Sequence, residues 1–322
     1  MLNFPIIGLA PIDGVTDVVF RQIVDECSRP DILYTEFVPV NGLILGKPVI
    51  TKMLLRHQTK TPIFAQLLGN EPDNFYKATI IALEAGFDGI DINMGCPDNN
   101  IVKRGSGAAL ILQPKLAQAI IKTVKKAVAD WGKKKAFVSV KTRIGFNKPI
   151  IKEWIGSLLE TELDIITLHA RSYSERYSGH AHWEEIAKAG AIVRGTKTKF
   201  FGNGDIKSLD EAKKKIKDYQ IDGVLIGRAA FGNPWMFGGH SPSFAERIQI
   251  LYRHCQLFNQ YFPNGDFRSL RKHFVWYVKS LPHAADLKNR LMKTECLDDV
   301  KKILEYSGDD EIADKIGNGS DA

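Results

Sequence analysis

The sequence predicts a (β/α)8 barrel, the TIM barrel, followed by a C-terminal all-helical domain. Eight short runs rich in β-branched and aromatic residues recur from the N-terminus to about residue 238, and amphipathic helical patterns separate most of them. Strands that alternate with helices require a parallel sheet, and eight such units match a closed barrel better than an open doubly wound sheet. No G-x-G-x-x-G motif follows the first run, which weakens the open dinucleotide-binding alternative without removing it.

Each of the eight runs is expected to form one strand. The expected strands begin at Ile6, Ile32, Ile63, Gly89, Phe137, Ile165, Lys199 and Gly223. Two of the helical patterns carry boundary signals, because the segment 74–86 stops at a glycine and the segment 114–131 starts at a proline. We therefore expect a catalytic barrel domain over residues 1–240, with its chemistry at the carboxyl ends of the strands.

After residue 240 the pattern becomes helical. Apolar residues recur at three or four residue steps from Phe244 to Phe262, which indicates a helix that buries one face. Further helical segments are expected over 269–281 and 286–307. We expect a helical domain over 241–310 and a flexible acidic tail over 311–322.

The composition is that of a protein with a large apolar core and a basic bias. Apolar residues make up 44% of the 322 residues, and 44 Lys and Arg against 37 Asp and Glu give a net charge of +7. The four cysteines form no C-x-x-C pair, so we expect no zinc site, no disulfides and a cytoplasmic location. The start is broken by prolines and a glycine, and no apolar run reaches membrane-spanning length, so we expect neither a signal peptide nor a membrane partner. A monomer is expected.

Polar side chains collect where the expected strands end. Loops that leave these ends converge over the axis of a barrel, and a purely structural layer would favour Val, Ile and Leu there. The sequence therefore predicts one shared polar ligand. The residues concerned are Glu36, Gln66, Asn93, Cys96, Lys141, Arg143, His169, Arg171, Asn203, Asp205 and Arg228.

Glycines in the last two βα loops indicate a phosphate site. Gly202, Gly204, Gly227 and Gly232 lie where many barrels bind phosphate through backbone N–H groups, and Arg228 can add a cationic fork. The alternative is that these glycines only permit tight turns. Together with Lys141, His169 and Asn203 they favour the phosphate interpretation.

Lys141 and Gln66 suit a flavin. A nearby ammonium would stabilise the negative charge that a reduced flavin carries around N1 and O2, and Gln66 could hydrogen-bond the pyrimidine edge of the ring. The alternatives are a strand-end lysine that reaches solvent and, for His169, a satisfied core histidine. We assign His169 to cofactor binding and not to proton transfer.

Cys96 lies directly after the fourth strand, in a turn between Gly95 and Pro97. A buried cysteine often acts only as a small hydrophobe, but this thiol lies in a loop at the catalytic face. A thiol with an ordinary pKa near 8.5 is mostly protonated at neutral pH, so it can act as a general acid. That role fits the reduction of a double bond, in which hydride reaches one carbon and a proton reaches its neighbour.

The motifs resemble those of the tRNA-dihydrouridine synthase family. The resemblance runs through APIDGVTDVVFR (10–21), AQLLGN (65–70), DINMGCPDNNIVKRGSGAALI (91–111), VKTRIG (140–145), LHARSYSERYSG (168–179), FGNGDI (201–206) and IGRAAFGNPW (226–235), and it extends to about residue 300. It implies an FMN-dependent, NADPH-driven reduction of the C5–C6 bond of uridines in the D-loop of tRNA, with Cys96 as the proton donor to C5.

The site that we expect on this basis has two parts. FMN would be held by Pro11, Gln66, Lys141, His169, Asn203, Gly204, Asp205, Gly227 and Arg228. The resemblance places Asn93, Lys103 and Arg171 at the uridine or the adjacent phosphate.

The helical domain adds candidates for tRNA contact. Between residues 241 and 293, nine Lys and Arg face three acids, with aromatic residues interleaved, so Arg271 and Lys272 are predicted to bind phosphate. The alternative is a solvated cationic helix face. A uridine that reaches a barrel mouth has to leave its stack, so a flipped base is expected.

Two other functions stay open at this point. One is an FMN barrel that acts on a free pyrimidine, of the dihydroorotate dehydrogenase type. The other is an RNA-binding protein that keeps the barrel as a scaffold without catalysis.

Overall fold

The computed structural model describes residues 2–279 and 284–305, so the tail predicted at 311–322 lies outside the described residues. The chain forms two compact units. One comprises Met1–Val18 and Pro30–Gly227, and the other comprises Val19–Arg29 and the described residues from Arg228 onwards. The assignment of a catalytic domain to residues 1–240 and of a tRNA-binding domain to residues 241–310 stays a prediction, because the compact units do not show what each part does.

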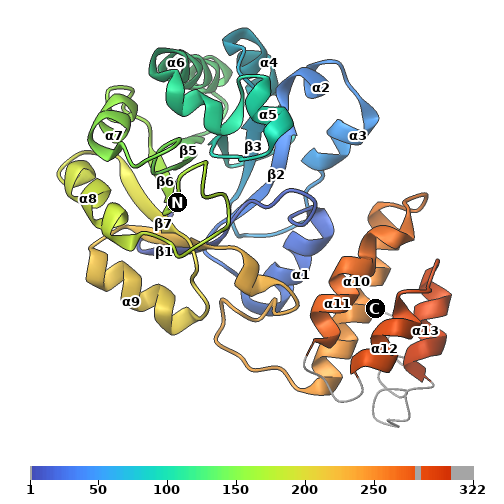
Figure 1. The fold of residues 1–322 in the computed structure, drawn as a ribbon. Coiled ribbons are helices and arrows are strands. Elements are labelled where there is room, and N and C mark those ends of the chain that lie inside the picture. Colours follow the sequence, from blue (N-terminus) through green and yellow to red (C-terminus); the bar gives the residue numbers. More distant parts are fainter. Residues whose placement is uncertain (1, 280–283, 306–322) are drawn as a thin grey trace. The chain divides into compact units, whose positions relative to one another are not determined.

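The first unit is a closed parallel barrel, as the sequence predicts (Figure 1). Its strands are β1 (Ile6–Leu9), β2 (Leu33–Pro39), β3 (Ile63–Leu68), β4 (Gly89–Met94), β5 (Phe137–Arg143), β6 (Ile165–His169), β7 (Lys199–Asn203) and β8 (Gly223–Ile226). Neighbours in sequence are neighbours in the sheet, and β1 pairs with β8. The Asp31 N–H donates to the Ile7 carbonyl at 3.1 Å and the Leu9 N–H to the Ile32 carbonyl at 3.0 Å. These bonds join β1 to the start of β2, which excludes the open sheet.

Helices surround the strands of this unit (Figure 1). The helical elements are α2 (Val40–Ile44), α3 (Pro48–Thr51), η1 (Lys52–Leu54), α4 (Pro72–Glu84), α5 (Asn99–Lys103), η2 (Gly107–Leu112), α6 (Pro114–Trp131), α7 (Ile151–Leu159), α8 (Trp183–Val193) and α9 (Leu209–Tyr219). Helix α6 shows why they form where predicted. Pro114 begins it, Gly132 ends it in the left-handed conformation, and Ala117, Ile121 and Val124 bury one face.

The amino-terminal part of the barrel is filled by apolar side chains. Ile6, Phe64 and Ile165 lie at or next to the first residues of their strands, and they are buried in one cluster with Tyr34 and Phe201. The Tyr34 and Phe64 rings meet edge to face with centroids 5.5 Å apart. This apolar floor leaves the carboxyl ends of the strands to the polar residues.

The second unit is helical. It contains α1 (Val18–Ser28) from Val19 onwards, η3 (Arg228–Ala230), α10 (Phe244–Tyr261), η4 (Phe267–Leu270), α11 (Arg271–Val278), α12 (Ala284–Leu291) and α13 (Leu297–Glu305). A capping box of Ser243 and Glu246 begins α10. The Arg253 guanidinium lies 3.0 Å from the Glu26 carboxylate, which joins α10 to α1.

One expectation for this unit is corrected. The segment predicted as one helix over 286–307 is divided in the described part of the chain, because α12 ends at Leu291 and α13 begins at Leu297. The Thr294 hydroxyl donates to the Leu291 carbonyl at 2.7 Å, and the Asp299 carboxylate accepts the Glu295 and Cys296 N–H groups at 2.9 and 3.3 Å. These side-chain bonds replace the backbone bonds of a continuous helix.

Across residues 2–279 and 284–305, no helix combines the length and the apolar character that crossing a membrane demands.

A buried pair of histidines lies between α10 and α11. The His254 and His273 rings have centroids 4.4 Å apart, and His254 Nδ1 lies 3.1 Å from the Tyr277 hydroxyl. Within the described part of the chain, His254 Nε2 and His273 Nδ1 have no hydrogen-bond partner. Burial lowers the pKa of His254 to about 3, and it lowers the pKa of His273 well below the ordinary value.

We therefore expect the second unit to be destabilised by acid. A histidine whose pKa is depressed by folding contributes its full stability above the unfolded pKa of about 6.5, and that contribution is lost as the pH falls toward the folded value. For His254 the loss amounts to about 2 kcal/mol at pH 5. Hydrogen exchange of α10 and α11, corrected for the intrinsic pH dependence of exchange, should show this loss. The loss should vanish in the double variant that carries His254→Phe and His273→Phe. If the wild type had the same opening free energy at pH 5 and at pH 7, the prediction would be wrong.

Candidate active site

The polar residues predicted at strand ends lie on neighbouring strands at matching positions. Asn93 on β4 pairs with Lys141 on β5, and Arg143 on β5 pairs with His169 on β6. His169 in turn pairs with Asn203 on β7. The register thus brings these side chains to the carboxyl end of one barrel, where barrel enzymes carry out their chemistry.

A chain of hydrogen bonds runs from Gln66 to Cys96. Asn93 Nδ2 donates to Gln66 Oε1 at 2.8 Å, and Asn93 Oδ1 accepts the Gly95 and Cys96 N–H groups at 3.1 and 2.9 Å. Gln66 Nε2 donates to Asp91 Oδ2 at 2.7 Å. The side chain of Asn93 therefore fixes the backbone that carries the Cys96 thiol.

The loop that follows β4 folds back on Cys96. The Ala108 N–H donates to the Cys96 carbonyl at 3.1 Å. Gly107 has a positive φ of 61°, and a Cβ there would lie 2.9 Å from the Cys96 carbonyl oxygen, so only glycine fits. Cys96 is a free, half-buried cysteine, and burial raises the pKa of its thiol. The thiol is therefore protonated at neutral pH, and it can donate a proton.

Lys141 is a half-buried cation whose ammonium makes no hydrogen bond or ion pair to any residue that the structure describes. Burial, together with the Arg143 charge, lowers its pKa to about 8, although Asp91 and Cys96 oppose the shift. An ammonium in this state gains by binding an anion.

Arg143 holds two loops together. Its Nε donates to the Gly95 carbonyl at 2.7 Å, and its Nη1 donates to the Ser172 and Arg176 carbonyls, both at 2.9 Å. Its guanidinium also lies 5.7 Å from the centre of the Tyr177 ring. The sequence marks Arg143 as polar at a strand end, but this link between the Cys96 loop and the loop after β6 appears only in the structure.

Arg171 is almost fully buried, and four of its donors are used inside the protein. It donates to the Ser178 and Gly179 carbonyls at 2.9 and 2.7 Å and to both oxygens of Asp205 at 3.1 and 2.6 Å. These bonds take four of the five N–H groups of a guanidinium. Asp205 also accepts the Ala181 N–H at 2.9 Å. The two residues tie the loops after β6 and β7 together, and their predicted ligand contacts stay predictions.

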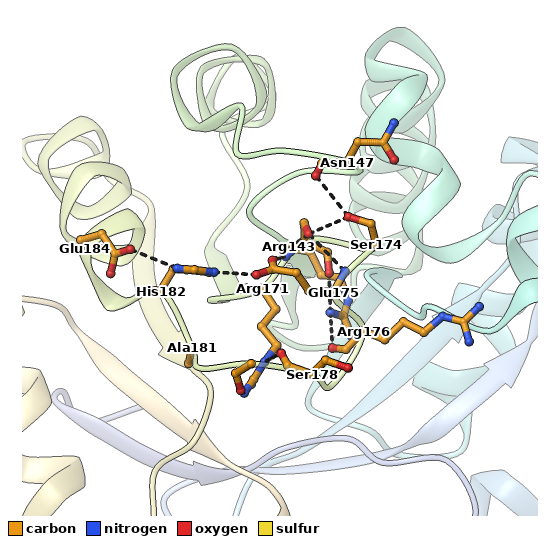
Figure 2. Close-up of polar contacts among 12 residues, drawn as sticks. Arg143, Asn147, Arg171, Ser174, Glu175, Arg176, Ser178, Ala181, His182 and Glu184 are labelled. Atoms are coloured by element: carbon orange, nitrogen blue, oxygen red, sulfur yellow. Dashed lines mark hydrogen bonds and ion pairs between the residues drawn. The ribbon is translucent and has the colours of Figure 1, made fainter.

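The loop after β6 is also fixed at its far end. Figure 2 shows His182 between Glu175 and Glu184, at 2.6 and 3.1 Å. The Glu175 hydrogen bond raises the pKa of His182. Glu175 also accepts the N–H and the hydroxyl of Ser172, each at 2.7 Å. This loop is therefore held by charged and polar contacts along its length.

The glycines predicted to bind phosphate leave little room for side chains. Gly204 has φ of 133°, and a Cβ there would lie 2.9 Å from the Ala181 Cβ and 3.4 Å from His169. A Cβ on Gly227 would lie 3.3 Å from Ile12, beside Pro11. Asn203 Nδ2 donates to the Leu225 carbonyl at 2.8 Å, which joins β7 to β8. The last loops thus approach the end of β1 closely.

The remaining predicted residues are not all in the barrel. Lys103 ends α5 and is exposed. Arg228, Arg271 and Lys272 belong to the second unit, and Arg228 follows Gly227 directly in the chain. Sequence reasoning missed Asp91, Ser139 and Asp98. Asp91 and Ser139 are buried, and the Asp98 side chain accepts the Asn100 and Ile101 N–H groups that begin α5.

The site is thus a protonated thiol and a half-buried cation at the carboxyl ends of the strands of a parallel barrel. A family model described as dihydrouridine synthase matches residues 8–313, so the chain belongs to the dihydrouridine synthase family. Dihydrouridine carries two more hydrogens than uridine, so the family is one of oxidoreductases.

Two curated relatives and one solved structure are similar to this chain. A probable tRNA-dihydrouridine synthase of Staphylococcus aureus (strain COL) is 33% identical over 310 residues, which cover 94% of this chain and 92% of that protein. Probable tRNA-dihydrouridine synthase 2 of Bacillus subtilis (strain 168) is 34% identical over 311 residues, which cover 94% and 93%. The 6-hydroxypseudooxynicotine amine oxidase of Pseudomonas geniculata N1 has a TM-score of 0.50 at 12% identity, covering 71% of this chain and 45% of that one, and it supports the fold alone.

The ion pair of Arg171 and Asp205 gives a prediction. Asp205→Ala leaves the buried Arg171 guanidinium without its carboxylate. The free energy of local opening of the loop 170–182 should fall by about 3 kcal/mol. This value is at the low end for a buried ion pair, because Asp205 is partly exposed. Hydrogen exchange of this loop measures the effect. Asp218→Ala removes an exposed carboxylate from α9, outside the loop, and serves as the control. Equal exchange of the loop in the two variants would contradict the assignment.

Proposed function

We propose that the chain is a tRNA-dihydrouridine synthase that uses FMN and NADPH. The observation that carries this proposal is the protonated Cys96 thiol, whose backbone N–H is held by Asn93. Asn93 pairs across the sheet with Lys141, whose ammonium has no partner among the residues that the structure describes. The balanced reaction takes uridine, NADPH and a proton to dihydrouridine and NADP⁺. The two curated relatives are named as probable tRNA-dihydrouridine synthases, which supports the tRNA substrate and the product of this proposal.

The residues at the strand ends fit FMN. Lys141 is a cation without a partner among the described residues, and Gly204 and Gly227 lie in loops where a Cβ would be crowded. Gln66, Lys141 and His169 would face the ring, while the remaining predicted residues would hold the phosphate side: Pro11, Asn203, Gly204, Asp205, Gly227 and Arg228. Asp205 would act there by holding Arg171. When bound, reduced FMN supplies the hydride that C6 of the uracil ring accepts.

Cys96 supplies the proton in this proposal. As C5 of the uracil gains electron density, the Cys96 thiol gives its proton to C5, and solvent protonates the thiolate afterwards. The Asn93 carboxamide holds the Cys96 backbone, and Arg143 holds the Gly95 carbonyl beside it. Positioning of this kind keeps the donor near the reacting carbon.

The substrate is proposed to be tRNA, with a D-loop uridine extruded from its stack. Lys103 is exposed at the end of α5, and Asn93 keeps one N–H for the uracil. Arg271 and Lys272 on α11 are proposed to bind the RNA backbone. Membership of the dihydrouridine synthase family favours this substrate over a free pyrimidine, and the intact thiol and ammonium favour an enzyme over a catalytically inactive scaffold.

Cys96→Ala tests the proton donor. It should retain FMN at the wild-type stoichiometry and form dihydrouridine about 10²–10⁴ times more slowly, the range for loss of a general acid. Mass spectrometry of unmodified tRNA after a single turnover measures the product. Cys296→Ala removes an exposed thiol and should leave the rate unchanged. Wild-type rates in Cys96→Ala would remove the proposed role of this residue.

Charge changes on α11 test the proposed RNA contact. Lys272 is exposed, whereas the Nε of Arg271 is buried, so Lys272→Glu with Arg271→Gln changes the charge with less risk to the fold. Binding of unmodified tRNA should weaken, and the slope of log affinity against log salt should fall by about one for each lost phosphate contact. Lys217→Glu on α9 gives a control in the other unit. An unchanged salt slope would count against this contact, and the FMN content should not change.

A further inference from the structure

Asp91 is a carboxylate in the middle of β4 with an exposed fraction of 0%. Its two oxygens accept hydrogen bonds from side chains of the two neighbouring strands. Gln66 Nε2 on β3 donates to Oδ2 at 2.7 Å, and the Ser139 hydroxyl on β5 donates to Oδ1 at 2.5 Å. Asp91 can only accept while it is ionised, so both partners have to present a hydrogen to it.

This requirement sets the direction of the whole chain of amides. Gln66 turns its Nε2 to Asp91, so its Oε1 faces Asn93 and accepts from Nδ2. Asn93 then turns its Oδ1 to the N–H groups of Gly95 and Cys96. Reversing Gln66 would place an oxygen against the Asp91 carboxylate and an NH2 group against the NH2 group of Asn93. Both contacts would be repulsive in a site closed to water.

The direction decides what each amide can offer a ligand. Gln66 uses its oxygen on Asn93 and one N–H on Asp91, and among the described residues its second N–H has no partner. Asn93 is in the same state, since its oxygen is used twice and one of its two N–H groups is used on Gln66. Each amide therefore has one N–H left for a ligand, while the Asn93 oxygen is used twice and the Gln66 oxygen is turned toward Asn93.

We infer that Asp91 is a positioning residue: its carboxylate orients Gln66 and Asn93 so that both present N–H donors, Gln66 to the carbonyl or ring-nitrogen acceptors of the flavin and Asn93 to a carbonyl of the uracil. The inference rests on the proposed function in requiring that a flavin occupies this end of the barrel. Asp91 itself acts through Gln66 and has no contact with either ligand.

The charged groups around Asp91 keep it ionised near neutral pH. Burial raises its pKa to about 6, while the hydrogen bonds from Ser139 and Gln66 and the Lys141 ammonium on β5 oppose the rise. Tyr34 on β2 is another titratable group near Asp91. Its phenol stays protonated because burial and the Asp91 charge raise its pKa well above the ordinary value. A carboxylate below two strand-end amides is thus available as a fixed acceptor.

The test is a double-mutant cycle read by FMN binding to apoprotein, followed by quenching of flavin fluorescence. Gln66→Ala and Asp91→Ala should each weaken binding about tenfold, equivalent to one hydrogen bond of about 1.4 kcal/mol. Because Asp91 acts through Gln66, the double variant should also be about tenfold weaker. A hundredfold loss, the additive result, would overturn the inference.

Two further variants separate orientation from charge. Asp91→Asn keeps an oxygen for Gln66 and removes the charge beside Lys141, so binding should stay within about threefold of the wild type. A loss equal to that of Asp91→Ala would show that Asp91 acts on Lys141 by its charge, which would overturn the inference. Ser139→Ala removes the other bond of Asp91 and leaves the acceptor of Gln66 in place, and it should bind like the wild type.

A swapped pair covers the case in which Asp91→Ala does not fold. Gln66→Glu with Asp91→Asn restores a donor and an acceptor between the two positions but leaves no N–H at position 66 for the flavin. FMN should bind about tenfold more weakly than to the wild type, and wild-type affinity would overturn the inference. Failure of the wild-type protein to bind FMN would instead refute the proposed function, so the two failures are distinguishable.

Discussion

A carboxylate inside a parallel barrel has lost its water, and it has to find donors on the adjacent strands. Asp91 finds them in Gln66 and Ser139, one on each side. The bond to Gln66 has consequences beyond the pair, because an amide that donates on one side accepts on the other. Asn93 follows Gln66, and the backbone of Cys96 follows Asn93. The conformation of the loop that carries Cys96 therefore depends on the Asp91 carboxylate in the middle of β4. The apolar cluster at the amino-terminal end of the barrel keeps water away from this carboxylate.

The loops above the barrel are held by a second principle. Arg143 and Arg171 are buried, and four of the seven hydrogen bonds that they donate to described residues end on backbone carbonyls of the loop after β6. Loops usually lack the apolar contacts that fix helices and strands, so they are often mobile. A buried guanidinium can donate several hydrogen bonds in a fixed geometry, so a single arginine can hold several points of a loop. This arrangement lets a polar segment stand over the strand ends with a defined shape.

The sequence predicted the helices and strands better than the hydrogen-bond partners of the polar side chains. Seven of the eight strands begin at the expected residue, since β-branched runs between helical patterns mark strands strongly, and only β2 starts one residue later, at Leu33. The break between α12 and α13 was missed because Asp299, which caps α13, also fits the polar face of a longer helix. Asp91 was missed because a strand pattern shows where a side chain points but not which donors meet it. The four bonds of Arg171 were beyond sequence reasoning for the same reason. They leave one N–H of the guanidinium for the contact with the uridine or the adjacent phosphate that the resemblance implies.

Helix α1 has an effect on how the chain can be assembled and divided. It follows the first strand in the sequence. From Val19 onwards, however, it belongs to the same unit as the helices from Arg228 onwards, and its Phe20 ring lies against His254 and His273 of that unit. A ribosome therefore synthesises this segment long before its companions exist, and Phe20 lacks His254 and His273 as neighbours until synthesis is nearly finished. A fragment cut out at residue 241 would lack one of its own packing elements. The second unit is built from two separate stretches of the sequence, so no single cut in the chain releases it whole.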